Sequence, residues 1–125
     1  MLIYNKDLSV CPLTTHLPLK LIEKKIKKKI LKKKVKLVNS FFVKNFGFKP
    51  KMAVTGLNPH CESILRFNED DKILRPAIRS LKNEGYSING PYSADTIFLK
   101  QNRKKYNVIL GMYHDQVLTP IKTLK

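Results

Sequence analysis

"NVILGMYHDQ", residues 107–116, decides the fold because it sets an apolar run directly against polar, titratable residues. The apolar part is short, aliphatic and bounded by polar residues, which is typical of a strand buried on both faces. Three polar residues follow it at once: Tyr113, His114 and Asp115. The stretch therefore predicts a central strand that carries functional side chains to one edge of a sheet.

Similar apolar runs lie upstream, and segments of helical pattern separate them. We expect strands in "LSVCPLTT", residues 8–15, and in "KMAVTGL", residues 51–57. A helix is expected from Asn68 to Gly85, with a kink at Pro76, and the Asn-Gly-Pro sequence in residues 87–99 predicts a turn. Strands that alternate with helices indicate an α/β domain with a mostly parallel sheet and flanking helices.

The length and composition indicate a single domain, residues 1–125. Of its residues 42% are hydrophobic, which is compatible with a real core, and no apolar run approaches the roughly 18 residues that a membrane span needs. Residues 1–10 lack the apolar centre of an export signal, so we expect a cytoplasmic protein. Cys11 and Cys61 have no metal-type spacing and are expected to be free thiols in a reducing compartment.

Lysine dominates the charge of the chain. The formal net charge is +16, and ten lysines fall in residues 20–36, opposed there only by Glu23. Apolar residues recur at helical spacing through the same region, so we expect a lysine-rich amphipathic helix over residues 20–46. Such a helix can bind nucleic acid, lie on an anionic membrane or simply present a solvated face. No nucleic-acid-binding motif or interleaved aromatic residue favours the first two, and we expect neither partner.

The chain has only three histidines, and each follows a predicted strand: His16, His60 and His114. Because the carboxyl ends of parallel strands share one edge of a sheet, residues far apart in sequence can converge there. Three neutral imidazoles with an open position would hold zinc or a similar divalent ion. The alternative is that each histidine is an ordinary surface or core residue.

The segments that contain these histidines resemble a known family. "TTHLPL", "GLNPH", "NGPYSADTIF" and "MYHDQVLTPIK" are similar, in this order, to landmarks of the 4-hydroxythreonine-4-phosphate dehydrogenases of pyridoxal phosphate biosynthesis. The resemblance implies part of an isocitrate and isopropylmalate dehydrogenase-like fold. It also implies a homodimer with its active site near the interface, NAD or NADP as oxidant, and a divalent metal such as zinc, magnesium or cobalt.

The resemblance also assigns roles to individual residues. It makes the three histidines the metal ligands, gives the substrate phosphate to Lys122, and places Asp95 and Asp115 close to the chemistry. The implied reaction is the oxidation and decarboxylation of 4-phosphooxy-L-threonine to 3-amino-2-oxopropyl phosphate. From the residues alone, Asp95 could instead form a turn, and Asp115 could cap a strand end.

The resemblance covers well under half of the usual length of the family. After "GLNPH" this chain has "CESILRF", residues 61–67, where the family shows a glycine-rich stretch. Three hypotheses follow. The chain is a truncated dehydrogenase with reduced or no activity alone, a basic module that binds nucleic acid or anionic membrane, or an inactive remnant. We favour the first.

Overall fold

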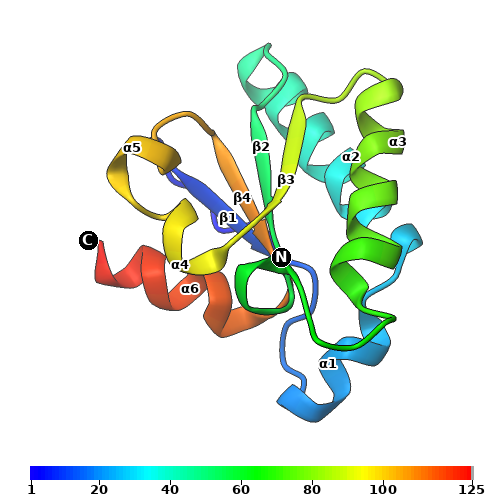
Figure 1. Ribbon diagram of the computed structural model, residues 1–125. Helices are drawn as coiled ribbons and strands as arrows, with labels where there is room; N and C mark the ends of the chain where they lie inside the picture. Colours follow the sequence, from blue (N-terminus) through cyan, green and yellow to red (C-terminus); the bar gives the residue numbers. More distant parts are fainter. Residues whose placement is uncertain (125) are drawn as a thin grey trace.

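The computed structural model in Figure 1 describes residues 1–124 and contains one four-stranded sheet, in the order β1-β4-β2-β3. The strands are β1 (Ser9–Pro12), β2 (Met52–Thr55), β3 (Ile88–Tyr92) and β4 (Val108–Gly111). Every neighbouring pair runs parallel, and β4 lies between β1 and β2. The α/β class, the parallel sheet and the three strands expected from apolar runs are confirmed.

Helices cover both faces of this sheet. In chain order they are α1 (Leu19–Lys25), α2 (Lys28–Phe46), α3 (Arg75–Asn83), α4 (Ala94–Ile97), α5 (Lys100–Arg103) and α6 (His114–Thr123). Figure 1 shows α2 and α3 on one side of the strands and α6 on the other. Within residues 1–124, no helix is long and apolar enough to cross a membrane.

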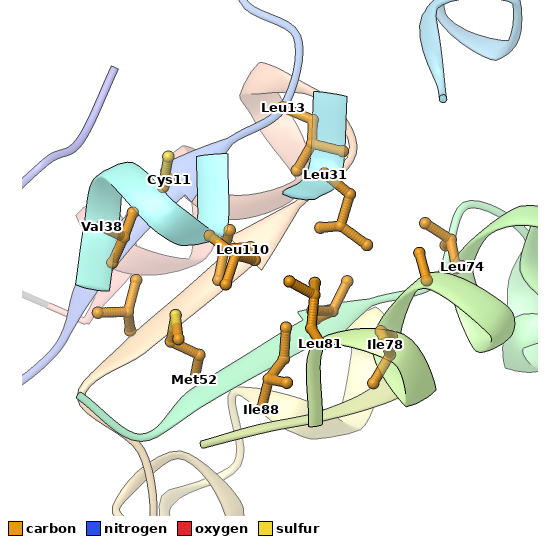
Figure 2. Packing of buried hydrophobic residues seen from close by; sticks show 14 of the residues in the cluster. Cys11, Leu13, Leu31, Val38, Met52, Leu74, Ile78, Leu81, Ile88 and Leu110 are labelled. Carbon is orange, nitrogen blue, oxygen red and sulfur yellow. The ribbon is translucent and has the colours of Figure 1, made fainter. Parts of the chain in front are cut away.

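The central strand β4 contributes buried side chains to both faces of the sheet, because successive residues of a strand point in opposite directions. Val108 and Leu110 pack into the layer of α2 and α3, whereas Ile109 packs with α6. Figure 2 shows the first layer, to which Leu110 and Leu81 both belong, and both are fully buried. Burial of one such side chain contributes about 1.5–3 kcal/mol, so this layer fixes the helices to the sheet.

The lysine-rich region forms two helices, not the single helix expected over residues 20–46. Ile26 and Lys27 adopt extended backbone angles between α1 and α2, and Ile26 is 0% exposed. The apolar residues explain the break. Ile26 and Leu31 are five residues apart, about 140° around a continuous helix, so one straight helix could not bury both on the same face. α2 ends at Phe46, where the expected helix also ends, and Gly47 follows in a left-handed conformation with φ of 75°.

The helix expected after Asn68 is present but begins irregularly. The Asn68 side chain accepts a hydrogen bond from the Asp71 backbone N–H at 2.9 Å, the expected capping contact. A π-helical segment, Asp70–Leu74, comes first, and α3 follows with Pro76 in its first turn. Because the backbone is helical without a break from Asp70 into α3, Pro76 removes one N–H from a continuous helix, and the irregular π-helical turn lies directly before it.

The turn expected at Asn-Gly-Pro is wrong, because residues 89–91 lie within β3. β3 is the outermost strand of the sheet and pairs only with β2. Proline lacks a backbone N–H, and it is tolerated in an outermost strand because the other side of that strand has no partner to bond. A Cβ atom at Gly90 would lie 2.5 Å from the Val54 carbonyl oxygen, so only glycine allows this close pairing. The pairing with β2 is irregular between Ala53 and Thr55.

Candidate functional site

The strand order places the segments that follow β1, β4 and β2 next to one another at the carboxyl ends of the strands, and this side of the sheet is called the strand edge below. These segments carry His16, His114 and His60, with His114 in the centre at the first residue of α6. The expectation that all three follow strands is confirmed. Their loops therefore lie together at the carboxyl ends of the strands, although His16 and His114 are 98 positions apart in the sequence.

Two of the histidines face each other across this edge. The ring centroids of His16 and His114 are 5.8 Å apart, with their planes tilted by 41°. Both rings line a cavity of about 200 Å³, together with Thr15, Leu17, Leu19, Ile22, Tyr113 and Asp115. A second hollow of about 430 Å³ shares Tyr113 with the first and reaches Leu57 and Asn58 in the loop after β2.

Asp115 orients the central histidine. Its Oδ1 lies 2.8 Å from His114 Nδ1, and the carboxylate itself is largely exposed. An ionised carboxylate only accepts hydrogen bonds, so Nδ1 carries the proton and donates it to Asp115. The lone pair of His114 Nε2 then remains available for a ligand in the cavity.

His60 is not part of the facing pair. It lies in the short 3₁₀ turn Pro59–Cys61, is exposed, and has a left-handed backbone with φ of 54°. Among residues 1–124, no group of three or more histidine, cysteine, aspartate or glutamate side chains is close enough to hold a metal ion. The structure thus brings two predicted ligands together and leaves the third in the loop alongside.

Gln116 ties the loops after β2 and β4 together. Its Oε1 accepts hydrogen bonds from Thr55 Oγ1 and from the Met112 backbone N–H, both at 2.7 Å, and its Nε2 donates to the Gly56 carbonyl at 2.8 Å. Thr14 Oγ1 donates to the Met112 carbonyl at 2.7 Å, which joins the loop after β1 to the same point. Side-chain bonds therefore hold all three histidine-bearing loops in register.

Comparison with known proteins gives the family. The family model for "Pyridoxal phosphate biosynthetic protein PdxA" matches residues 1–125, the whole chain. The chain belongs to the PdxA family. Two relatives are each named 4-hydroxythreonine-4-phosphate dehydrogenase: one from Xanthobacter autotrophicus is 41% identical, and one from a Sulfurihydrogenibium species is 40% identical. Each alignment covers 99% of this chain but only 36% and 38% of those proteins.

A solved PdxA relative shares the fold. The crystal structure of 4-hydroxythreonine-4-phosphate dehydrogenase from Klebsiella pneumoniae superposes with a TM-score of 0.87 at 30% identity. The superposition covers 98% of this chain and 38% of that one. The chain therefore spans well under half the length of the relatives it matches, with the same α/β architecture across that part.

The two facing imidazoles are close enough to reach one divalent ion. A zinc–nitrogen bond is about 2.0–2.1 Å, and a ring centre lies about 1.2 Å beyond the nitrogen, so two ligands of one tetrahedral ion have ring centroids about 5.3 Å apart. The centroids of His16 and His114 are 5.8 Å apart, close to this value. Imidazole ligands suit zinc or cobalt better than magnesium, which prefers oxygen.

Two further predicted site residues, Asp95 and Lys122, lie outside the cavity. Asp95 is exposed in the first turn of α4, after the edge strand β3. Lys122 is exposed near the other end of α6, about 12 Å of helix rise from His114. Neither lines the hollow that contains His16 and His114.

Two organising residues, Gln116 and Asp70, could not be recognised from the sequence. Gln116 directly follows the His-Asp pair, but a glutamine there has no distinctive pattern. Asp70 is placed by its sequence in the first turn of a helix, where an acidic residue is favourable and ordinary. Only the structure shows that its side chain turns to the loop that carries His60.

Proposed function

We propose that the chain carries the metal-binding part of a 4-hydroxythreonine-4-phosphate dehydrogenase. The reaction is the NAD- or NADP-dependent oxidation and decarboxylation of 4-phosphooxy-L-threonine to 3-amino-2-oxopropyl phosphate, in pyridoxal phosphate biosynthesis. The family match and the names of the relatives support this proposal. The observation that carries it is the facing pair, His16 and His114, at the strand edge.

A bound divalent ion supplies positive charge that makes a substrate hydroxyl more acidic and polarises a neighbouring carbonyl. His16 and His114 offer the ring nitrogens that would hold it, with His60 as the third donor from the adjacent loop. Asp115, with its carboxylate 2.8 Å from His114 Nδ1, would hold the proton on that nitrogen and leave the Nε2 lone pair for the ion.

Two further residues have roles in the proposal. Lys122 supplies a point charge for the substrate phosphate. A substrate held at both the histidines and Lys122 must extend along α6, because the two positions lie near opposite ends of that helix. Asp95 would exchange a proton with the substrate from the neighbouring strand end.

The proposal includes a homodimer with its active site near the subunit interface, in the cytoplasm. The chain matches only 36–38% of the length of its relatives, so we expect reduced or no turnover from this chain alone. The test is an assay of NADH or NADPH formation from 4-phosphooxy-L-threonine. Ready turnover by the purified chain would contradict the expected loss of activity and leave the assigned reaction standing.

Metal binding is the direct test of the site. We expect Zn²⁺ and Co²⁺ to bind more tightly than Mg²⁺ in calorimetric titrations, and His114→Ala to weaken Zn²⁺ binding by about 100-fold or more, because a direct ligand is lost. Thr119→Ala, an exposed change on the same helix, should bind like the unchanged chain. Circular dichroism confirms that each variant folds. Equal binding by the unchanged chain and the His114→Ala variant would contradict the proposed site.

A further inference from the structure

The carboxylate of Asp70 is fully buried and faces the loop that carries His60. The residue is 0% exposed and lies at the start of the π-helical segment before α3. Its Oδ1 accepts a hydrogen bond from the Leu57 backbone N–H at 2.8 Å. Its Oδ2 accepts from the backbone N–H of Asn58 at 3.2 Å and from Asn58 Nδ2 at 3.0 Å. All three donors come from the loop after β2.

These hydrogen bonds take the place of an ion pair. Within residues 1–124 the ion pairs are Lys36–Glu84, Arg75–Asp71 and His114–Asp115, so none includes Asp70. Burial of an unpaired charge is costly unless hydrogen bonds satisfy it, and bonds to a charged acceptor are stronger than bonds between neutral groups. The three hydrogen bonds from the loop therefore offset the free-energy cost of burying the Asp70 carboxylate. The same bonds fix the position of the loop.

Other residues of the loop also pack directly against the Asp70 carboxylate. A Cβ atom at Gly56 would lie 2.6 Å from Asp70 Oδ1 and 2.6 Å from Cys61 Sγ, so the backbone passes directly against both. At the other end, Arg75 Nη1 donates to the Cys61 carbonyl at 3.2 Å. The segment from Gly56 to Cys61 is thus fixed from the side of α3.

His60 and Cys61 both have left-handed backbones, with φ of 54° and 59°. Side chains other than glycine rarely adopt this conformation because Cβ crowds the backbone, so neighbouring contacts must hold it. The bonds to Asp70 and Arg75 flank these two residues. They set the direction in which the His60 side chain leaves the loop.

We propose that Asp70 is a positioning residue that holds His60 at the edge of the sheet beside His16 and His114. The inference rests on the proposed metal-binding function of those histidines. Asp70 touches neither cavity and acts only through the loop. Asn58, one of its partners, lines the hollow that adjoins the His16 and His114 cavity, so a shift of the loop changes the approach of a third ligand.

The first measurement uses the metal-free chain. Asp70→Asn keeps the size of the side chain but puts an NH₂ donor in place of one acceptor oxygen, against groups that are themselves donors. We expect hydrogen exchange at the Leu57 and Asn58 amides, followed by NMR, to become at least about tenfold faster. Glu69→Gln removes the same unit of charge one residue earlier, leaves the three Asp70 bonds in place and should change neither rate.

The second measurement asks whether this effect reaches the metal. We expect Asp70→Asn to weaken Co²⁺ binding by about 10–100-fold and to give the visible Co²⁺ spectrum of the His60→Ala variant. In the His60→Ala background, Asp70→Asn should cause no further loss, because the residue acts through His60. If Asp70→Asn does not fold, Asn58→Ala removes one partner of the same carboxylate and should show a smaller loss of the same kind.

The outcomes separate this inference from the proposed function. Unchanged Co²⁺ affinity and spectrum in Asp70→Asn, with His114→Ala still defective, would overturn the positioning role and leave the metal site standing. A further loss in the His60→Ala background would overturn it too, since Asp70 would then act on the fold in general. No Co²⁺ binding by the unchanged chain would instead refute the proposed function itself, and the positioning role with it.

Discussion

At the scale of single residues, the paired tyrosines Tyr92 and Tyr106 make stability sensitive to alkaline pH. The Tyr106 hydroxyl donates to Tyr92 Oη at 2.9 Å. Burial, then this hydrogen bond, raises the pKa of Tyr106 from 10.0 to about 12. An unfolded chain would lose this proton near pH 10 while the folded chain keeps it, so the free energy of unfolding should fall as pH rises through that interval.

The matching variant is Tyr106→Phe, which removes the titrating group. We expect urea unfolding between about pH 9 and 12 to show a shallower loss of stability in this variant than in the unchanged chain. Tyr4→Phe, a change at an exposed tyrosine, is the control and should follow the unchanged chain. If the free energy of unfolding fell equally with pH in Tyr106→Phe and in the unchanged chain, a raised pKa of Tyr106 would not be the cause of the alkaline loss of stability.

The candidate site could be predicted from sequence only for residues that follow strands. His16 and His114 meet because parallel strands share an edge, and the order of apolar runs and polar residues already contains that information. Asp70 and Gln116 could not be predicted, because each acts by hydrogen bonds to backbone groups in another segment. Such bonds depend on packing and leave no pattern along the chain.

At the scale of elements, the first turn of α6 locks the ends of β2 and β4 through Gln116. Gln116→Ala would leave the Thr55 hydroxyl, the Met112 N–H and the Gly56 carbonyl without this partner. Unmet buried groups cost about 1–3 kcal/mol each, and partial hydration offsets some of that, so we expect a loss of about 2–3 kcal/mol in the free energy of unfolding by urea.

Thr119→Ala on the exposed side of α6 is the matched control and should change stability by less than about 0.5 kcal/mol. If Gln116→Ala were equally mild, the three hydrogen bonds would not be what joins the two strand ends. The Gln116→Ala variant should also bind Zn²⁺ more weakly, because it frees the loop before His114 to move.

The elements themselves were predictable where hydrophobic pattern alone decides them. The buried strands could be predicted from short apolar runs, and the expected end of the lysine-rich helix agrees with the end of α2 at Phe46. The break at Ile26 was missed because the spacing on either side of it is helical, and only the five-residue step to Leu31 shows the change of face. β3 was missed because Asn-Gly-Pro is common in turns, and the open edge beside β2 overrides that local preference.

At the scale of the whole molecule, the structure bears on what the lysines can do. The apolar face of α2 is already buried against the sheet through Leu31, Val35, Val38 and Phe42. This face is therefore not available to a lipid surface, and the large apolar side chains that α2 leaves exposed are Leu37, Val43 and Phe46. That neither a membrane nor nucleic acid is a partner stays a prediction, which vesicle and DNA binding at low salt would test.

The same charge should oppose folding. The net charge is +16, and α2 places lysines four residues apart at Lys28–Lys32, Lys29–Lys33 and Lys32–Lys36. Like charges at this spacing cost about 0.2–0.5 kcal/mol per pair at low salt, or about 1 kcal/mol for the three. Added NaCl screens this repulsion, so the free energy of unfolding in urea should rise by about that amount between low and high salt.

A charge reversal separates local repulsion from the effect of net charge. Lys29→Glu converts one repulsive pair with Lys33 into an attractive one, whereas Lys100→Glu makes the same change of net charge on α5. We expect Lys29→Glu to raise low-salt stability more, and to flatten the salt dependence more, than Lys100→Glu. Equal effects would place the repulsion in the overall charge of the molecule. A fall in stability with salt would mean that attractive pairs such as Arg75–Asp71 outweigh the lysine repulsion.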